Sequence, residues 1–344
     1  MARPGDPQPM VGGRIAAPFD VIRPAHAELL VTDLARSREF YVGQLGLVVT
    51  EESNDAIYLR GYEDRHHHCL VLRRASAPAV GHLAFLVASD QDLDRAADHY
   101  RALGCPVQWV GEGAELGQGR ALRVQDPLGF PLEFFSQMSK VECLLRRYDL
   151  HRAARIQRID HFNLHVPDVQ AAFDVWFDLG FRCTEYICGD APDQTLYAAW
   201  LHRKPSVHDV ALTAGAGPRV HHVAFWQTDT DAIISLCDQL GGSRWHWTIE
   251  RGPGRHGVSN AFYLYLRDPD GHRIELYTAD YWTGDPDLEP IRWSVTDNQR
   301  RSFWGHPVPE SWYRESSLVV GLDGHPVDVV EPPAAEIHRE VVPQ

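Results

Sequence analysis

The stretch HVAFWQTD, residues 222–229, is a short apolar segment that ends in an aspartate, and it decides the fold because the chain repeats it. Its counterparts are AELLVTD at residues 27–33, HLAFLVASD at 82–90 and FNLHVPD at 162–168. In each copy the final aspartate is placed to cap a following helix, since its carboxylate can accept from the exposed amides of the first turn. The repeat therefore predicts several copies of one strand-then-helix unit.

A Leu-Gly pair closes the helical part of every copy, and β-rich runs follow it. The pairs stand at residues 45–46, 103–104, 179–180 and 240–241. Each copy then reads as a βαβββ module, and we place the modules at residues 25–75, 81–136, 158–214 and 220–278. The expected fold class is α+β, in which four βαβββ modules form two half-open β-barrel domains. A chain of 344 residues is long enough for two such cores.

The expected domain organisation follows from the modules. We expect a flexible arm, rich in Pro and Gly, before the first module, and an irregular aromatic tail after the last one, packed as a lid over a barrel mouth. The segments are an N-terminal arm at 1–20, an N-terminal domain at 21–140, a linker at 141–157, a C-terminal domain at 158–280 and a tail at 281–344.

Composition excludes several kinds of partner. The net charge of −14 makes nucleic acid an unlikely ligand, because phosphate binding needs a concentrated basic surface. No apolar run approaches the roughly 18 residues of a membrane span, and the N-terminus lacks the apolar core of a signal peptide. Six scattered cysteines without a CxxC pair argue against disulfide or zinc frameworks. We therefore expect a cytoplasmic protein with no membrane partner.

Two histidines and a glutamate stand at matching places in the last two modules. His161 and His222 each begin a first strand, and Glu275 lies in the final strand. Equivalent strands of paired modules lie side by side in such a barrel, so the three side chains can converge on one face. Two imidazoles and a carboxylate leave coordination positions open, as ferrous oxygenases require. We choose His222 by register and expect His221 on the opposite face, solvated or supporting its neighbour.

The first two modules carry the same residue types. His26, His82 and Glu133 align with His161, His222 and Glu275, and His68 falls near the position of His208. The residues around the two triads differ, because Glu28 and Arg123 stand where the second half has Asn163 and Tyr265. A triad without supporting residues holds metal poorly. We expect a vestige of duplication here, and a weak second metal site is the alternative.

The stretch GRHGVSNAFYLYLRDPDGHRIE, residues 254–275, identifies a family. The chain resembles the type I extradiol ring-cleaving dioxygenases of the vicinal oxygen chelate superfamily over roughly residues 22–315. The stretches at 202–225 and 296–305 are most similar to the branch that cleaves 3,4-dihydroxyphenylacetate. This resemblance implies a catalytic C-terminal domain that uses O2, with Fe(II) or alternatively Mn(II) as the metal. It also implies a homotetramer that acts on a carboxylated catechol in aromatic compound catabolism.

The resemblance also implies roles for individual residues. His208 matches the acid–base histidine, Tyr265 matches a tyrosine that contacts a substrate oxygen, and His256 matches a further histidine of the catalytic group, just outside the metal ligands. The implied substrate-binding residues are Asn163, Trp200, Arg251, Val258, Arg300 and Arg301. Arginine can hold a carboxylate through two parallel hydrogen bonds, so the three arginines are candidates for a carboxylate site. A purely structural role stays open for each of these residues.

Two other classes use the same module. A metal-dependent glyoxalase-like isomerase or lyase typically adds a second carboxylate ligand, where this chain has His161 or His208. A drug-sequestering binding protein needs no metal at all. The complete triad and the long signature around His256 and Tyr265 favour the dioxygenase.

Overall fold

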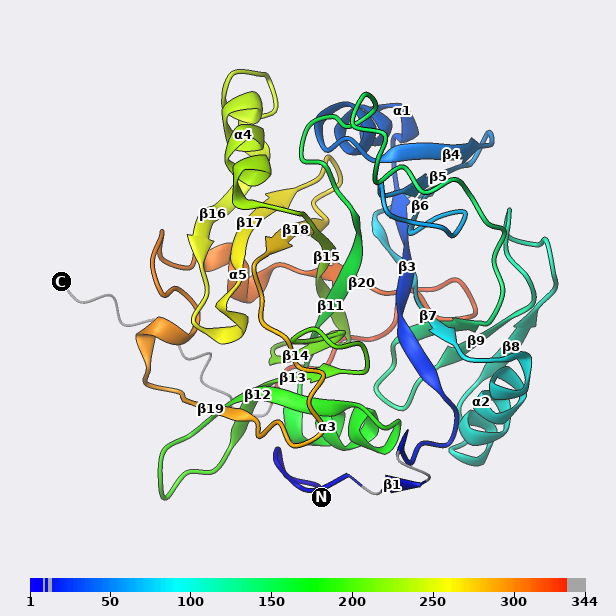
Figure 1. Ribbon diagram of the computed structural model, residues 1–344. Helices are drawn as coiled ribbons and strands as arrows, with labels where there is room; N and C mark the ends of the chain where they lie inside the picture. The colour runs from blue at the N-terminus through cyan, green and yellow to red at the C-terminus, as the bar shows by residue number, and fades with distance from the viewer. Residues whose placement is uncertain (9, 12–13, 333–344) are drawn as a thin grey trace.

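The computed structural model describes residues 1–8, 10–11 and 14–332 and contains two large curved sheets (Figure 1). Each sheet is built from two of the predicted modules, and each module has the element order strand, helix and then three strands. The predicted α+β fold class with four βαβββ modules is confirmed. The domain limits drawn from the sequence stay predictions.

The first half of the chain forms an eight-stranded sheet in the order β4-β5-β6-β3-β7-β10-β9-β8. Its first module is β3 Val21–Val31, α1 Leu34–Arg38 with the π-helical turn Glu39–Gln44, β4 Val48–Glu52, β5 Ala56–Arg60 and β6 Leu70–Arg74. Its second module is β7 Ala79–Val87, α2 Asp90–Ala102, β8 Val107–Val110, β9 Ala121–Gln125 and β10 Pro131–Phe135.

The second half forms a ten-stranded sheet in the order β16-β17-β18-β15-β11-β14-β13-β12-β19, with β20 paired to β15. Its first module is β11 Arg158–Val166, α3 Val169–Asp178, β12 Arg182–Cys188, β13 Leu196–His202 and β14 Val210–Ala214. Its second module is β15 Arg219–Trp226, α4 Thr230–Gly241, β16 Ile249–Arg255, β17 Phe262–Arg267 and β18 Arg273–Thr278. Short 3-10 turns lie at His246–Thr248 and Val258–Asn260.

The same pairing rule builds both sheets. The first and last strands of a module run parallel, as in β3 with β6 and β15 with β18, and the two first strands meet antiparallel, as in β3 with β7 and β11 with β15. The first strands of all modules are therefore central, and any ligand residues they carry face each other across the sheet. This topology brings His161 and His222 together.

Helix capping follows the predicted pattern with one difference. Asp33, Asp168 and Asp229 cap α1, α3 and α4 with their carboxylates, as expected. Ser89, rather than Asp90, caps α2 by accepting from the amide of Asp92. The serine hydroxyl reaches the same orphan amides of the first turn, so the helix begins one residue earlier than the aspartate pattern indicates.

The apolar core is continuous between the two halves. Phe85 of β7 packs against Phe162 of β11 at 5.6 Å between ring centroids and against Trp176 of α3 at 5.5 Å. All three side chains are buried. The two sheets therefore share one hydrophobic interior, which fixes their relative orientation.

The terminal segments that the structure describes contact the second sheet. Near the N-terminus β1 Met10–Val11 and β2 Arg14–Ile15 pair antiparallel, and Gln8 donates to the carbonyl of Phe181 at 2.7 Å. The tail adds β19 Ile291–Ser294, a 3-10 turn at Asn298–Arg300, α5 Glu310–Arg314 and β20 Ser317–Leu318. Residues 333–344 of the predicted tail lie outside the described residues. No helix in the described part of the chain is long and apolar enough to cross a membrane.

Candidate metal centre and substrate cavity

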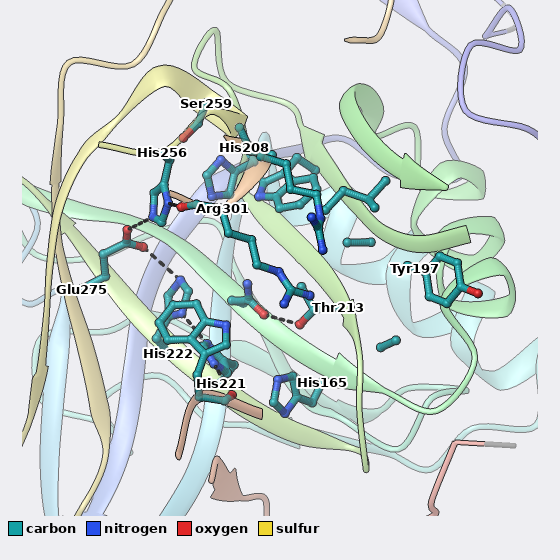
Figure 2. Close-up of a pocket in the computed structure, with 18 of the residues that line it drawn as sticks. His165, Tyr197, His208, Thr213, His221, His222, His256, Ser259, Glu275 and Arg301 are labelled. Carbon is teal, nitrogen blue, oxygen red and sulfur yellow. Dashed lines mark hydrogen bonds and ion pairs between the residues drawn. The ribbon is translucent and has the colours of Figure 1, made fainter. Parts of the chain in front are cut away.

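The His161, His222 and Glu275 side chains of the second sheet line one cavity. Figure 2 shows this cavity, with His222 and Glu275 labelled. Strands from both modules and segments of the tail surround it. The lining residues named in the sequence prediction are His161, Asn163, Trp200, His208, His222, His256, Val258, Tyr265, Glu275, Arg300 and Arg301. The structure thus gathers the predicted site in one place, with Arg251 as the exception.

The three predicted ligands converge on a single point. Glu275 Oε2 lies 2.9 Å from His161 Nε2 and 3.0 Å from His222 Nε2, and the two Nε2 atoms are 3.3 Å apart. All three side chains are buried. Burial alone would raise the pKa of Glu275, but His222, His161 and His256 together hold it well below its usual range. The carboxylate is therefore ionised and faces two imidazole nitrogens.

Asp160 orients the first imidazole. Its Oδ2 lies 2.8 Å from His161 Nδ1, so the Nδ1–H donates to the carboxylate and the lone pair of a neutral ring lies on Nε2. Neighbours on a strand normally point to opposite faces, but a β-bulge at Asp160 breaks the register between Ile159 and His161. The bulge brings the aspartate to the side of the ligand.

His221 orients the second imidazole in the same way. Its Nδ1 lies 2.7 Å from His222 Nδ1, and a second bulge breaks the β11–β15 register at this position. The prediction that His221 points to the opposite face is therefore wrong, because the bulge tilts its side chain toward His222. The contact agrees with the other interpretation of His221, in which it supports its neighbour. His221 is buried, so the solvated alternative is excluded.

The donor set fits a divalent metal such as Fe(II) or Mn(II). Asp160 and His221 occupy the Nδ1 atoms of the two histidines, which leaves both Nε2 atoms directed at Glu275. Glu275 Oε1 is buried and has no hydrogen-bond partner among the described residues. Metal-ligating histidines usually donate their other nitrogen to such neighbours, and nitrogen with carboxylate oxygen suits these metals.

Tyr265 and His256 form a hydrogen-bonded pair beside Glu275. His256 Nδ1 donates to the carbonyl of Arg301, so a neutral His256 accepts the Tyr265 hydroxyl proton on Nε2 at 2.9 Å. Burial lowers the pKa of His256, and burial together with Glu275 raises the pKa of Tyr265 well above its usual range. The pair is therefore neutral. Figure 2 shows His256 and His222 on either side of Glu275.

His208 lies against the first ligand. Its ring centroid is 3.8 Å from that of His161, and its Nδ1 has no hydrogen-bond partner among the described residues. Burial and the neighbouring His161 hold its pKa well below its usual range. The ring is neutral and lines the cavity.

Asn163 is held in one orientation. The Thr213 hydroxyl donates to Asn163 Oδ1 at 2.8 Å, which fixes the amide oxygen on that side. Asn163 lines the cavity, and its NH2 group is the part of the amide that can donate to a bound molecule. Trp200 and Val258 line the walls, and the turn that carries Val258 is fixed by Glu185, which accepts from the Ser259 amide at 2.6 Å.

Two of the three predicted arginines line the cavity. Arg300 and Arg301 reach it from the tail, and Arg301 donates to the Tyr313 hydroxyl at 2.6 Å. Arg251 instead lies behind the wall, 4.6 Å from the Trp312 ring and 5.8 Å from the Tyr265 ring, and it donates to the Ser302 hydroxyl at 2.6 Å. It is buried and is not a lining residue, because β16 places it beneath Tyr265. Its predicted contact with a substrate carboxylate lacks support in this position.

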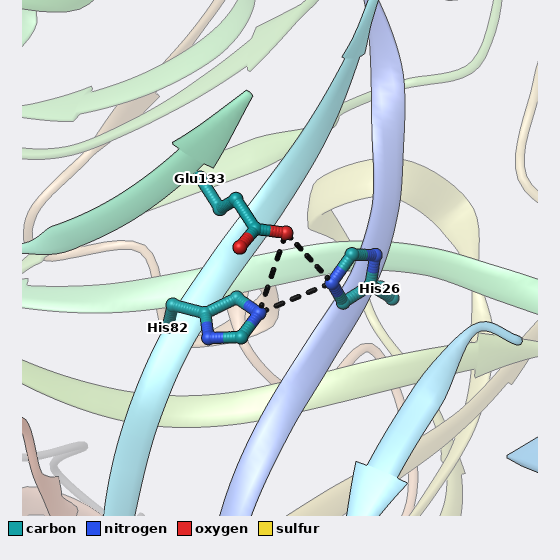
Figure 3. A group of neighbouring side chains, drawn as sticks. All are labelled: His26, His82 and Glu133. Carbon is teal, nitrogen blue, oxygen red and sulfur yellow. Dashed lines mark hydrogen bonds and ion pairs between the residues drawn. The ribbon is translucent and has the colours of Figure 1, made fainter. Parts of the chain in front are cut away.

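The N-terminal triad also converges (Figure 3). His26 Nε2 lies 3.1 Å from His82 Nε2 and 3.3 Å from Glu133 Oε1. The surroundings differ, because Arg123 Nε donates to Glu133 Oε2 at 2.7 Å and Gln118 donates to Oε1 at 2.7 Å. The Arg123 guanidinium thus already forms an ion pair with the Glu133 carboxylate, where the second triad has no such cation on Glu275 among the described residues. His26 Nδ1 is buried without a partner in the part of the chain that the structure describes.

Sequence reasoning missed several residues of the site. Asp160 supports His161 and Thr213 supports Asn163, and Tyr197, Ser259, Trp312 and Tyr313 also line the cavity. Asp160 and His221 each precede a predicted ligand in the sequence, which is a signal for a supporting role. That signal can be read only if a bulge is expected at each position, because neighbours on a regular strand point to opposite faces. The tail residues had no signal beyond their aromatic character.

The chain belongs to the Glyoxalase/Bleomycin resistance protein/Dioxygenase superfamily, whose family model matches residues 23–134 and 158–276. The two matched stretches coincide with the two sheets. The resemblance to this superfamily drawn from the sequence is therefore confirmed.

Named relatives narrow the comparison to extradiol dioxygenases. A manganese-dependent 2,3-dihydroxybiphenyl 1,2-dioxygenase from Geobacillus genomosp. 3 is 32% identical over 84% of this chain and 95% of its own length. A metapyrocatechase from Geobacillus stearothermophilus is 30% identical, with 88% and 95% covered. Homoprotocatechuate 2,3-dioxygenase from Brevibacterium fuscum, solved with 3,4-dihydroxyphenylacetate, is 52% identical with a TM-score of 0.89, covering 94% of this chain and 99% of that one.

Proposed function

We propose that this chain is a metal-dependent extradiol dioxygenase that cleaves a catechol with O2, beside its two hydroxyl groups. The proposed substrate is 3,4-dihydroxyphenylacetate and the product 5-carboxymethyl-2-hydroxymuconate semialdehyde. One observation carries the proposal: the His161, His222 and Glu275 donors converge in a cavity that also holds His208 and the Tyr265–His256 pair. The similarity to homoprotocatechuate 2,3-dioxygenase supports the choice of substrate.

His161, His222 and Glu275 would hold the metal, for which we propose Fe(II), with Mn(II) as the alternative. When bound, such a metal brings a catechol and dioxygen together and lets electron density pass between them. The ligand residues contribute by keeping two neutral imidazoles and one carboxylate in fixed positions. Asp160 and His221 maintain those positions from behind. Because one relative is manganese-dependent, Mn(II) is retained beside Fe(II) as a candidate metal for this chain.

The proton transfers are assigned to neutral groups around the triad. Tyr265 is hydrogen-bonded to His256, so its hydroxyl oxygen can accept from a substrate hydroxyl while its own proton is held by His256. His208 is neutral and lines the cavity, so its imidazole can receive a substrate proton and later return it. These positions give the two substrate oxygens separate proton partners.

The remaining lining residues orient the substrate. Asn163 presents its NH2 group, and Trp200 and Val258 bound the ring. Arg300 and Arg301 lie at the tail side of the cavity and are proposed to attract and hold the substrate carboxylate. Arg251 would support them by holding the segment around Ser302. On a chain of net charge −14, such a local cationic group is what an anionic substrate requires.

We further propose that the protein works in the cytoplasm as a homotetramer, as the resemblance implies. Size-exclusion chromatography with light scattering tests this assembly. A monomer at micromolar concentration would contradict it.

Oxygen consumption on a panel of catechols tests the function. Metal-free protein is loaded anaerobically with Fe(II) or Mn(II), mixed with 3,4-dihydroxyphenylacetate or 4-methylcatechol, and then exposed to air. We expect a yellow ring-opened product, with kcat/KM about 100-fold higher for the carboxylated substrate. Arg301→Ala should raise KM for 3,4-dihydroxyphenylacetate and leave KM for 4-methylcatechol unchanged, so the difference in kcat/KM between the two substrates should decrease. Failure of both metals to support oxygen uptake with either catechol would contradict the dioxygenase and favour the isomerase or binding-protein alternatives.

A further inference from the structure

The C-terminal tail touches the ligand His222 through an intermediate residue. Helix α5 brings Trp312 against the metal centre, with its ring 4.3 Å from His221 and 4.5 Å from Tyr265. The backbone carbonyl of Trp312 lies 3.1 Å from His221 Nε2. The opposite nitrogen of the same ring, His221 Nδ1, lies 2.7 Å from His222 Nδ1. One buried imidazole thus joins the tail backbone to a proposed metal ligand.

The hydrogen positions in this chain follow from chemistry. A carbonyl only accepts, so His221 must carry its proton on Nε2. In a neutral ring the lone pair then lies on His221 Nδ1, which accepts from Nδ1–H of His222. A proton of His222 is thereby kept on Nδ1, which leaves Nε2, 3.0 Å from Glu275 Oε2, as the nitrogen whose lone pair a metal would take.

The first half of the molecule lacks this arrangement at the equivalent position. His82 pairs with Glu28 across the β3–β7 ladder as His222 pairs with Asn163 across β11–β15, and a bulge precedes both histidines. The bulge residue of the first half that corresponds to His221 is Gly81, and glycine has no side chain that could contact His82. A Cβ on Gly81 would lie 2.3 Å from Glu28 Oε1, so the position is already filled.

We infer that the Trp312 carbonyl, acting through His221, fixes the tautomer of His222 and so makes metal retention depend on the seating of the C-terminal tail. His221 is a positioning residue in this scheme, because it contacts a ligand and not the substrate. The effect on metal retention rests on the proposed metal centre. The proton on His222 Nδ1 can be tested without a metal. Outer partners of this kind commonly contribute 10- to 100-fold to metal affinity.

The tautomer can be read directly in metal-free protein. Nitrogen-15 spectra of histidine-labelled wild type, assigned with single-site variants, report which ring nitrogen carries each proton. We expect His221 protonated on Nε2 and His222 on Nδ1. A His221 proton on Nδ1, or a His222 proton on Nε2 alone, would overturn the relay. Because this measurement needs no metal, its failure is distinct from failure of the proposed function, which would show as wild-type protein that binds no metal.

Metal affinity tests the consequence. The dissociation constant for Mn(II) is measured by chelator competition, with the unfolding temperature of each metal-free protein recorded beside it. His221→Phe keeps a ring but loses both hydrogen bonds, so its dissociation constant should rise about 10- to 100-fold. His221→Asn retains an acceptor near His222 and should recover most of that loss. Equal losses in both variants, or an unchanged affinity in His221→Phe, would overturn the inference.

A second buried histidine provides the control. His272 also bonds through both ring nitrogens, to Ser317 of the tail and to the carbonyl of Leu30, but it contacts none of the proposed ligands. His272→Phe should lower the unfolding temperature and leave the Mn(II) dissociation constant within about twofold. A loss of affinity as large as that of His221→Phe would show a general effect of tail loosening and would overturn the relay through His221.

Discussion

The two halves of the molecule carry the same triad on the same sheet, and they differ in what surrounds it. His26, His82 and Glu133 stand at the registers that His161, His222 and Glu275 occupy, even to the β-bulge before each histidine. The bulge residues differ, because Ala25 and Gly81 replace Asp160 and His221. The bulge residues of the first half therefore offer no polar side chain to the two imidazoles, and Glu28 Oε1 instead lies 3.7 Å from His82 Nδ1.

Charge separates the halves further. The second half pairs Asn163 with Thr213 at 2.8 Å, whereas the first half places the ion pair Glu28–Arg73 at the same registers, at 2.6 Å. Arg123 stands opposite Glu133 where Tyr265 stands opposite Glu275. A guanidinium beside the carboxylate opposes a divalent cation by like charge. We therefore expect that ligand types at the right spacing do not suffice for a metal site, which also needs oriented lone pairs and an uncompensated negative charge.

Matched alanine substitutions should give the largest contrast. His222→Ala removes a proposed ligand and should lower kcat for 3,4-dihydroxyphenylacetate by about a thousandfold or more. His82→Ala, at the same register of the other half, should keep kcat within about twofold, because no reacting group lies near it. Steady-state oxygen uptake gives both values. A loss of turnover in His82→Ala that thermal unfolding does not explain would break the comparison.

The ion pair of the first half should matter for stability instead. Arg123→Gln leaves the fully buried Glu133 without its cation and should lower the free energy of unfolding by about 3 kcal/mol. Arg101→Gln breaks a pair with Asp98 in which both side chains are exposed and should cost less than about 1 kcal/mol. Urea denaturation of metal-free protein measures both. Equal effects would mean that Arg123 contributes no more than a surface charge.

Orientation of Asn163 should give the smallest effect. Thr213→Val removes the hydroxyl that fixes the amide oxygen, so the NH2 group no longer faces the cavity in every molecule. We expect KM for the catechol to rise about tenfold with metal content unchanged, and Thr213→Ser to restore it. A serine variant as impaired as the valine variant would show that the methyl group, and not the hydrogen bond, is what matters.

Most of the fold and the three proposed metal ligands could be predicted from the sequence, because the patterns that indicate them are periodic or repeated. Four apolar strands with capping residues gave the modules, and the pairing of equivalent strands brought His161 to His222. The bulges could not be predicted, since one extra residue in a strand leaves no pattern, and so Asp160 and the direction of His221 were missed. The placement of Arg251 beneath Tyr265 depends on strand register, and the approach of Trp312 depends on tertiary packing of an aperiodic tail.

Metal content per chain tests the central claim most directly, namely that only the second triad holds metal. Wild-type protein, His26→Ala and His161→Ala are loaded anaerobically with Fe(II) or Mn(II), desalted and analysed by mass spectrometry against protein concentration. We expect one equivalent in wild type, one in His26→Ala and none in His161→Ala. Two equivalents in wild type, or metal lost from His26→Ala and retained by His161→Ala, would contradict it.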